Sequence, residues 1–254
     1  MKILVLVKSA VDEAELKSDA SGRALLAGAQ TKISTFDKNA VEAAVSLKER
    51  VGGSVAALSL GSQDSRKAVK EALAMGCEKA ALILSDGPLD TVATSYYLAA
   101  QIKKAGGADL IFCSEGSSDT FQDQVGAMVA EFLGLPFIPY AKKVDLENGK
   151  VRCEQILDEG VRVSEAGLPS VISVVSEANE PRYPTLLQSM QASKKPIEEV
   201  PVASLKGPGL PGTAIEVLDV IGHSVARKRV ILEGTPEEAA KKLVDELRLE
   251  GAIK

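Results

Sequence analysis

The chain has 254 residues, of which 45% are hydrophobic and 26% are charged, so it can bury a sizeable core. Its formal net charge is −5, and the basic residues do not gather in one aromatic-rich patch, which argues against nucleic acid as a partner. No apolar run reaches the ~18–20 residues that span a bilayer, and no separate signal-peptide cleavage site follows the first residues, so we expect a cytoplasmic protein.

The residue types that dominate hydrolytic and metal chemistry are scarce. Cys77, Cys113 and Cys153 are too few and too scattered for a zinc site or a disulfide framework, so we expect buried free thiols. The single histidine, His223, would have to support any Ser/His/Asp triad or histidine-rich metal site alone. We therefore expect no catalytic residue and no metal ligand.

From the N-terminus, short apolar runs alternate with segments of helical spacing. The apolar runs predict strands that are buried on both faces and paired in parallel. They are residues 2–7, 54–60, 79–84 and 108–113. The helices between them are expected at 39–51, 62–75 and 91–105. This order predicts an open, doubly wound α/β sheet with its ligand crevice at the carboxyl ends of the strands.

The fourth strand is followed by a loop of small and polar residues, 114–126, which runs into a helical pattern at 127–133. Small residues expose backbone N–H groups, and the positive end of the following helix favours an anion. The layout suits a phosphate group. Ser/Gly-rich loops of this kind are also common as plain connections, so the residues alone leave both interpretations open.

The middle of the chain contains strands without intervening helices. They are expected at 138–146, 150–158, 161–165 and 170–176, with a turn at 147–149. We interpret them as an antiparallel extension of the same sheet.

The segment Asn179-Glu180-Pro181-Arg182-Tyr183-Pro184-Thr185-Leu186 contains two prolines. These bar a regular helix or a central strand through 181–184, so Tyr183 and Leu186 are displayed from a stiff loop. An apolar side chain on such a loop suggests docking to a partner. The alternative is an ordinary turn with Leu186 folded into its own core.

The C-terminal part differs in composition. Residues 201–212 are rich in proline and glycine, which predicts an extended arm. Thr235-Pro236-Glu237-Glu238 then opens a terminal helix with a capping-box pattern. We expect this helix to pack on a neighbouring subunit, with its own domain as the alternative surface. The chain is thus divided into an α/β domain, 1–200, with a recognition loop at 179–196, and an arm plus helix, 201–254.

Several segments together resemble the β subunit of electron-transfer flavoproteins. Residues 179–186, with Met190, Ala192 and Lys194-Lys195-Pro196, are similar to the family element N-E-P-R-Y-x-T-L-x-x-x-M-x-A-x-K-K. Residues 72–76 (A-L-A-M-G) and 36–42 (F-D-K-N-A-V-E) resemble two further family elements. The resemblance runs in order over almost the whole chain and implies a fold of the adenine-nucleotide-binding α/β type.

The resemblance also implies particular site residues. Loop 114–126 is similar to the family loop D-x-D-x-x-Q-T/V-G around the phosphate of AMP, although Asp123 would place a like charge beside that phosphate. The positions implied for AMP are Leu6, Ser34, Asp37, Leu60, Asp119, Asp123, Gln124, Val125 and Gly126. Phe36 corresponds to a residue that approaches the flavin, with core packing as the alternative. Tyr183, Leu186 and Met190 are implied as partner-docking residues.

The function implied is that of an electron carrier and not of an enzyme. In a heterodimer, the chain would share FAD with an α subunit and hold AMP. It would take electrons from acyl-CoA or related dehydrogenases and pass them to a membrane quinone oxidoreductase. In electron-bifurcating relatives a second FAD fills the AMP site and accepts hydride from NADH; we favour AMP here. A stand-alone ATP- or AMP-binding module like the universal stress proteins is a further alternative, but it leaves 179–196 unexplained.

Overall fold

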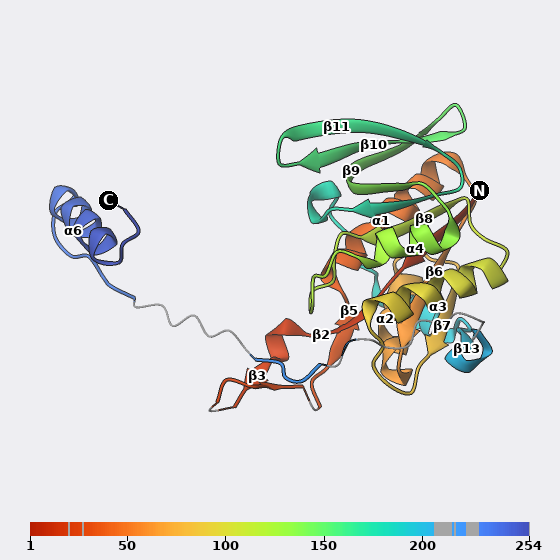
Figure 1. Ribbon diagram of the computed structural model, residues 1–254, viewed down its shortest axis with the longest axis horizontal. Coiled ribbons are helices and arrows are strands. Elements are labelled where there is room, and N and C mark those ends of the chain that lie inside the picture. Colours follow the sequence, from red (N-terminus) through yellow and green to blue (C-terminus); the bar gives the residue numbers. More distant parts are fainter. Residues whose placement is uncertain (20, 27, 206–214, 216, 222–228, 254) are drawn as a thin grey trace.

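The computed structural model describes residues 1–19, 21–26, 28–205, 215, 217–221 and 229–253. Among these residues the central feature is a nine-stranded sheet with the order β11-β10-β9-β12-β8-β1-β6-β7-β13 (Figure 1). Its strands are β1 (Lys2–Leu6), β6 (Ser54–Gly61), β7 (Lys79–Leu84), β8 (Leu110–Ser114), β9 (Phe137–Glu147), β10 (Lys150–Leu157), β11 (Gly160–Gly167), β12 (Ser170–Val174) and β13 (Glu198–Pro201).

Most neighbouring strands in this sheet are parallel, and only β10 runs antiparallel to its neighbours β9 and β11. The predicted doubly wound, mostly parallel sheet with an antiparallel extension is confirmed. The placement of the strand expected at 170–176 in the antiparallel extension is wrong, because β12 lies between β8 and β9 and pairs in parallel with both. Every residue of β12 is buried, which suits a central parallel strand.

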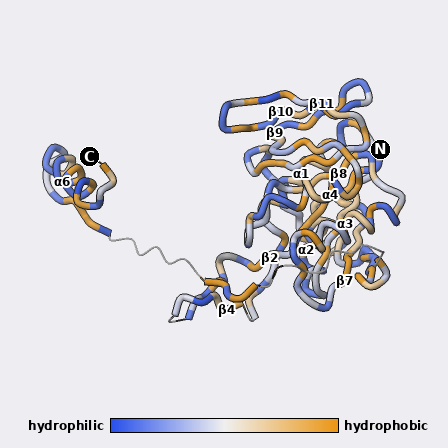
Figure 2. Tube along the Cα trace, in the orientation of Figure 1, coloured by the Kyte–Doolittle hydropathy of each residue, from blue (hydrophilic) through white to orange (hydrophobic). Residues whose placement is uncertain are grey.

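Helices cover both faces of the sheet. Along β1 successive side chains point to opposite faces, so Ile3 and Val5 join one apolar cluster while Leu4 and Leu6 join the other. The helices α1 (Thr35–Val51) and α2 (Arg66–Ala74) pack on the first face, and α3 (Thr91–Lys104) and α4 (Val125–Leu133) on the second. Figure 2 shows hydrophobic segments gathered in this body of the protein.

The order of strands reverses at β1. The chain runs outward from β1 to β6 and β7 and then crosses back to β8 on the other side of β1. The loops after β1 and β8 therefore lead to opposite faces, which opens a crevice at the carboxyl ends of these two strands.

Short elements that the sequence did not predict lie between β1 and α1. They are the strand β2 (Ser9–Val11), which pairs with β5 (Thr31–Ile33), the strand β3 (Lys17–Ser18), which pairs with β4 (Ala24–Leu25), and the 3-10 helix η1 (Glu13–Glu15). A second 3-10 helix, η2 (Gln63–Ser65), precedes α2, with Ser62 as its N-cap. Consequently α2 begins four residues later than the expected start at 62.

After β12 the chain forms η3 (Ser176–Ala178), then helix α5 (Leu186–Lys194), and reaches β13 at the edge of the sheet. Next comes η4 (Val202–Leu205), whose Leu205 is buried, so any extended arm begins after residue 205. Residues 206–214 and 216, which carry most of the predicted arm, lie outside the described residues.

The terminal helix α6 (Pro236–Leu249) forms as expected. Thr235 and Glu238 make the predicted capping box, and Pro236 occupies the first turn. None of its residues is buried, and it lies apart from the sheet in Figure 1. No helix in the described part of the chain combines the length and the apolar character needed to cross a lipid bilayer.

Candidate nucleotide site and docking surface

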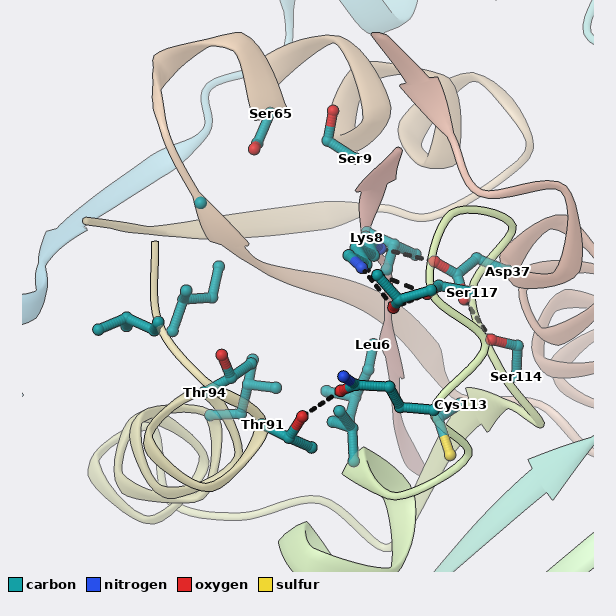
Figure 3. Close-up of a pocket in the computed structure, with 18 of the residues that line it drawn as sticks. Leu6, Lys8, Ser9, Asp37, Ser65, Thr91, Thr94, Cys113, Ser114 and Ser117 are labelled. Atoms are coloured by element: carbon teal, nitrogen blue, oxygen red, sulfur yellow. Dashed lines mark hydrogen bonds between the residues drawn. The ribbon is translucent and has the colours of Figure 1, made fainter. Parts of the chain in front are cut away.

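A cavity of about 580 Å³ lies at the carboxyl ends of the central parallel strands. Its walls come from the loops that follow β1, β6, β7 and β8 and from the first residues of α4. Figure 3 shows side chains from these separate segments converging on one space, with Lys8 and Ser117 on one side and Thr91 and Thr94 on another. The cavity occupies the position that the reversal in strand order predicts for a ligand.

Lys8 hydrogen-bonds to three residues of the loop that follows β8. Its Nζ donates to Asp119 Oδ1 at 2.7 Å, to Ser117 Oγ at 3.2 Å and to Thr120 Oγ1 at 3.3 Å. Burial opposes ionisation of Asp119, but its hydrogen bonds to Lys8 and Ser117 outweigh this and lower its pKa. Asp119 therefore shapes the loop through Lys8 and does not itself line the cavity.

Asp37 joins α1 to the same loop. One carboxyl oxygen accepts from the backbone N–H of Lys8 at 2.6 Å, and the other accepts from Ser114 Oγ at 2.5 Å. Burial raises the pKa of Asp37 to about 7, against the lowering effect of these two hydrogen bonds. Ser34, at the start of α1, accepts from the backbone N–H of Ser118 at 3.1 Å. The 34–37 turn is thus hydrogen-bonded to the 114–126 loop.

The N-terminus of α4 is open to the cavity. Its N-cap residue, Gln124, makes no side-chain capping bond, whereas Asp90 caps α3 and Thr185 caps α5. Val125 and Gly126 line the cavity, so the first N–H groups of α4 suit an anionic ligand. A Cβ at Gly126 would come within 2.6 Å of Cys113 Sγ, which explains glycine at this position.

Two residues beside this helix end have left-handed backbone conformations. Asp123 has φ 51° and accepts a hydrogen bond from the Tyr140 hydroxyl, so one oxygen of the carboxylate expected to repel phosphate is already engaged. Phe121 has φ 42°, and its ring packs edge-on against Phe36 with 5.2 Å between ring centroids. Phe36 therefore pairs with Phe121 and does not line the cavity.

The cavity gathers most of the nucleotide-site residues expected from the sequence. Those lining it are Leu6, Asp37, Leu60, Asp123, Gln124, Val125 and Gly126. Ser34, Phe36 and Asp119 lie around it and hold its loops.

Sequence reasoning missed several other lining residues. Lys8 and Ser9 lie two and three residues after the end of β1, at the reversal of strand order, and that position alone was the available signal. Ser9 Oγ and Thr31 Oγ1 are buried without a hydrogen-bond partner among the described residues. Both residues line the cavity.

The described residues contain no cluster of His, Cys, Asp or Glu side chains fit to hold a metal ion. His223 lies outside the described residues. Cys77, Cys113 and Cys153 are free and buried, as expected, and burial raises the pKa values of their thiols, that of Cys77 to about 12.

The segment around Leu186 forms a second surface. Leu186 begins helix α5 and does not sit on a loop, because Thr185 and Gln188 form a complete capping box. Tyr183, Leu186, Leu187 and Met190 are exposed by 92%, 79%, 64% and 53% respectively. Leu186 is thus not a core residue, and the alternative interpretation of this segment is wrong.

The sheet and its cavity define an α/β protein of the doubly wound class. A family model for the electron transfer flavoprotein domain matches residues 25–205. An electron transfer flavoprotein subunit beta from Thermoanaerobacterium thermosaccharolyticum is 33% identical over 255 residues, covering 97% of this chain and 98% of that protein. Those from Megasphaera elsdenii and Mycobacterium tuberculosis are 38% and 34% identical, over 81% and 96% of this chain and 80% and 92% of their own lengths. The chain therefore belongs to the electron transfer flavoprotein family, as a beta subunit.

Proposed function

We propose that this chain, with an alpha subunit, carries electrons from an acyl-CoA dehydrogenase or a similar flavin dehydrogenase to a membrane quinone oxidoreductase. FAD shared between the two subunits would supply the redox chemistry. The observation that carries the proposal is the exposed apolar face of α5, made by Leu186, Leu187 and Met190. A face of this kind, on a helix that begins with a complete capping box, suits transient docking of a protein donor.

For the cavity we propose AMP as the nucleotide. The open N-terminus of α4 would hold its phosphate through the backbone N–H groups of Val125 and Gly126. Leu6 and Leu60 supply apolar wall for the adenosine. The role of this nucleotide would be structural.

One observation favours the alternative, a second FAD in an electron-bifurcating carrier. The cavity continues beyond the 114–126 loop to residues 85–89 and to the start of α3, where Thr91 and Thr94 line it. Thr91 also hydrogen-bonds to Gln122 of the loop, so the two parts form one continuous wall. A dinucleotide would use this extra length, and AMP alone would leave it to water.

Chromatography of the nucleotides released by denaturing the purified heterodimer tests both assignments. We expect one FAD and one AMP per heterodimer. Two FAD and no AMP would replace the proposal with the bifurcating carrier. A colourless monomer that retains ATP or hydrolyses it would instead indicate a stand-alone nucleotide-binding module.

We also propose that the C-terminal part packs on the alpha subunit. The backbone N–H of Ala24 donates to Val220 O at 2.9 Å, so residues 217–221 lie along the β3–β4 hairpin. Large apolar side chains are exposed on these two segments and on α6. They are Leu16, Leu25, Leu26, Val217, Leu218, Ile221, Leu243, Val244 and Leu249. Such surfaces are typical of a subunit interface.

Leu186→Ala tests the docking role. Burying one leucine contributes roughly 1.5–3 kcal/mol, or about ten- to over a hundredfold in affinity. We expect the variant heterodimer to be reduced more slowly by that factor at sub-saturating concentrations of a purified acyl-CoA dehydrogenase, with its flavin and nucleotide content unchanged. Val51→Ala, which removes an exposed apolar side chain at the end of α1, should have no effect. An unchanged rate for Leu186→Ala would remove the docking assignment.

A further inference from the structure

We propose that Arg182 is the positioning residue of helix α5. Its guanidinium group, held by two carboxylates of α1, sets the orientation in which the exposed apolar side chains of α5 meet the electron donor. The inference rests on the docking role proposed above for Leu186, and Arg182 would act through that residue.

The guanidinium group of Arg182 makes two bidentate ion pairs. Nε and Nη2 donate to the two carboxylate oxygens of Glu42 at 2.8 and 2.9 Å. Nη1 and Nη2 donate to those of Glu49 at 2.7 and 3.1 Å. The backbone N–H of Arg182 also donates to Glu42, at 3.0 Å. Because the fork of donors is planar and rigid, this arrangement fixes both the position and the direction of the chain at residue 182.

The pair with Glu42 is partly withdrawn from water. The Glu42 side chain is 11% exposed and that of Arg182 is 34% exposed, whereas Glu49 is 51% exposed. Burial opposes ionisation of Glu42, but hydrogen bonds from Arg182 and Ser46 outweigh it and lower the pKa of Glu42. Loss of Arg182 would leave this carboxylate buried without its countercharge. The ion pair with Glu49 contributes little to folding stability, since exposed ion pairs are weak, and serves mainly to orient the guanidinium group.

A second set of hydrogen bonds holds the chain just before Arg182. Asn39 Nδ2 donates to the backbone oxygens of Ser176 and Asn179 at 2.8 and 2.9 Å. Asn179 Nδ2 donates back to Asn39 O at 3.0 Å. Asn39, Glu42 and Glu49 are spaced by three and seven residues, so they share one face of α1. Residues 176–182 therefore follow that face.

The other end of α5 is anchored independently. Ala192 is buried, and Lys195 Nζ donates to Cys77 O at 2.9 Å beyond the end of α2. The exposed side chains of Tyr183, Leu186 and Met190 lie between this anchor and Arg182. With both anchors in place, the exposed apolar side chains of α5 keep one orientation relative to the sheet. With the Arg182 anchor removed, only a fraction of molecules would present it correctly, and the apparent affinity for the donor would fall by that fraction.

The test measures how reduction of the heterodimer by a purified acyl-CoA dehydrogenase depends on heterodimer concentration. For Arg182→Met we expect the half-saturating concentration to rise about tenfold, the value for a competent fraction of about one tenth, with the maximal rate unchanged. Arg182→Lys keeps the charge without the fork and should fall in between. An unchanged half-saturating concentration in Arg182→Met overturns the proposal. If Arg182→Met fails to assemble with the alpha subunit, an unchanged half-saturating concentration in Arg182→Lys overturns the proposal.

Arg50→Met is the matched control. Arg50 follows Glu49 near the C-terminal end of α1 and makes no contact with Arg182; it donates to Asp145 at 2.5 Å and to Val144 O at 2.7 Å, so its loss removes a comparable contact from α1 to β9. It should lower the melting temperature to a similar extent without moving the half-saturating concentration. Equal rises in the two variants would show a general loss of stability and overturn the positioning role.

A double variant separates this proposal from the docking role on which it rests. If Arg182 acts through Leu186, then Arg182→Met combined with Leu186→Ala should raise the half-saturating concentration no more than the larger single change. If the two changes raise the half-saturating concentration additively, or if Leu186→Ala raises it and Arg182→Met does not, the positioning role is overturned and the docking role stands. If Leu186→Ala leaves the half-saturating concentration unchanged, the docking role itself is removed.

Hydrogen exchange should also be faster at the amides of 186–194 in Arg182→Met, and not in Arg50→Met.

Discussion

At the scale of single residues, Asp37 is a buried carboxyl group with a strongly raised pKa. Its carboxyl is buried at the start of α1, and burial raises its pKa from 3.8 to about 7. Between these two values the folded chain holds a proton that the unfolded chain has released. The free energy of unfolding therefore falls as the pH rises through this range, by up to about 1.4 kcal/mol per pH unit.

Asp37→Asn should abolish this dependence, because asparagine keeps an acceptor oxygen and does not ionise. Relative to wild type, the variant chain should gain stability as the pH rises from about 4 to about 7, and the difference should level off above that. Calorimetric unfolding of the purified chain across that range measures the effect. Asp145→Asn is the control. Burial alone would raise the pKa of Asp145, but hydrogen bonds from Arg50 and Lys143 outweigh burial and lower it. The stability that the Asp145 carboxylate contributes is therefore lost only as the pH falls below this range. Parallel profiles for Asp37→Asn and wild type would contradict the raised pKa.

Residues differ in how far their roles could be predicted from the sequence. Gln124, Val125 and Gly126 could be placed at a helix start, because the loop before them is rich in small residues and the pattern after them is helical. Lys8 could not. A lysine after a strand carries no local signal, and its partner Asp119 is 111 residues away. Only the fold brings them together.

Among the elements, the prediction worked where the apolar pattern was long and failed where position in the sheet mattered. The parallel strands and their helices were expected within a few residues. The apolar run of β12 predicted a strand, but nothing local distinguishes the extension from the gap between β8 and β9. Helix α5 was missed because Pro181 and Pro184 dominate the pattern before it and obscure the capping residues Thr185 and Gln188. Strand β13 ends in a proline, which argues against a strand except at an edge.

For the whole molecule, the buried apolar residues among those described all lie between Ile3 and Leu205. We therefore expect a chain that ends at Leu205 to have the same melting temperature in isolation as the full chain. It should lose most of its affinity for the alpha subunit, because the apolar surfaces of 217–221 and α6 are removed. Calorimetry and co-purification with a tagged alpha subunit measure the two effects. A chain ending at residue 234 tests α6 separately. A large fall in melting temperature, or undiminished assembly, would count against this division.

Helix α1 contacts both the nucleotide cavity and the segment that carries the docking surface. It presents Asp37 to the cavity and, further along, Glu42 to the segment that leads into α5. Five residues of helix separate the two side chains, about 7.5 Å along the axis. A densely packed helix shifts as one body, so a substitution that re-seats α1 for a different nucleotide also re-aims the docking face. In evolutionary terms, the two specificities should drift together, and a lineage that exchanges its nucleotide should need compensating changes around Arg182 to keep its electron donor.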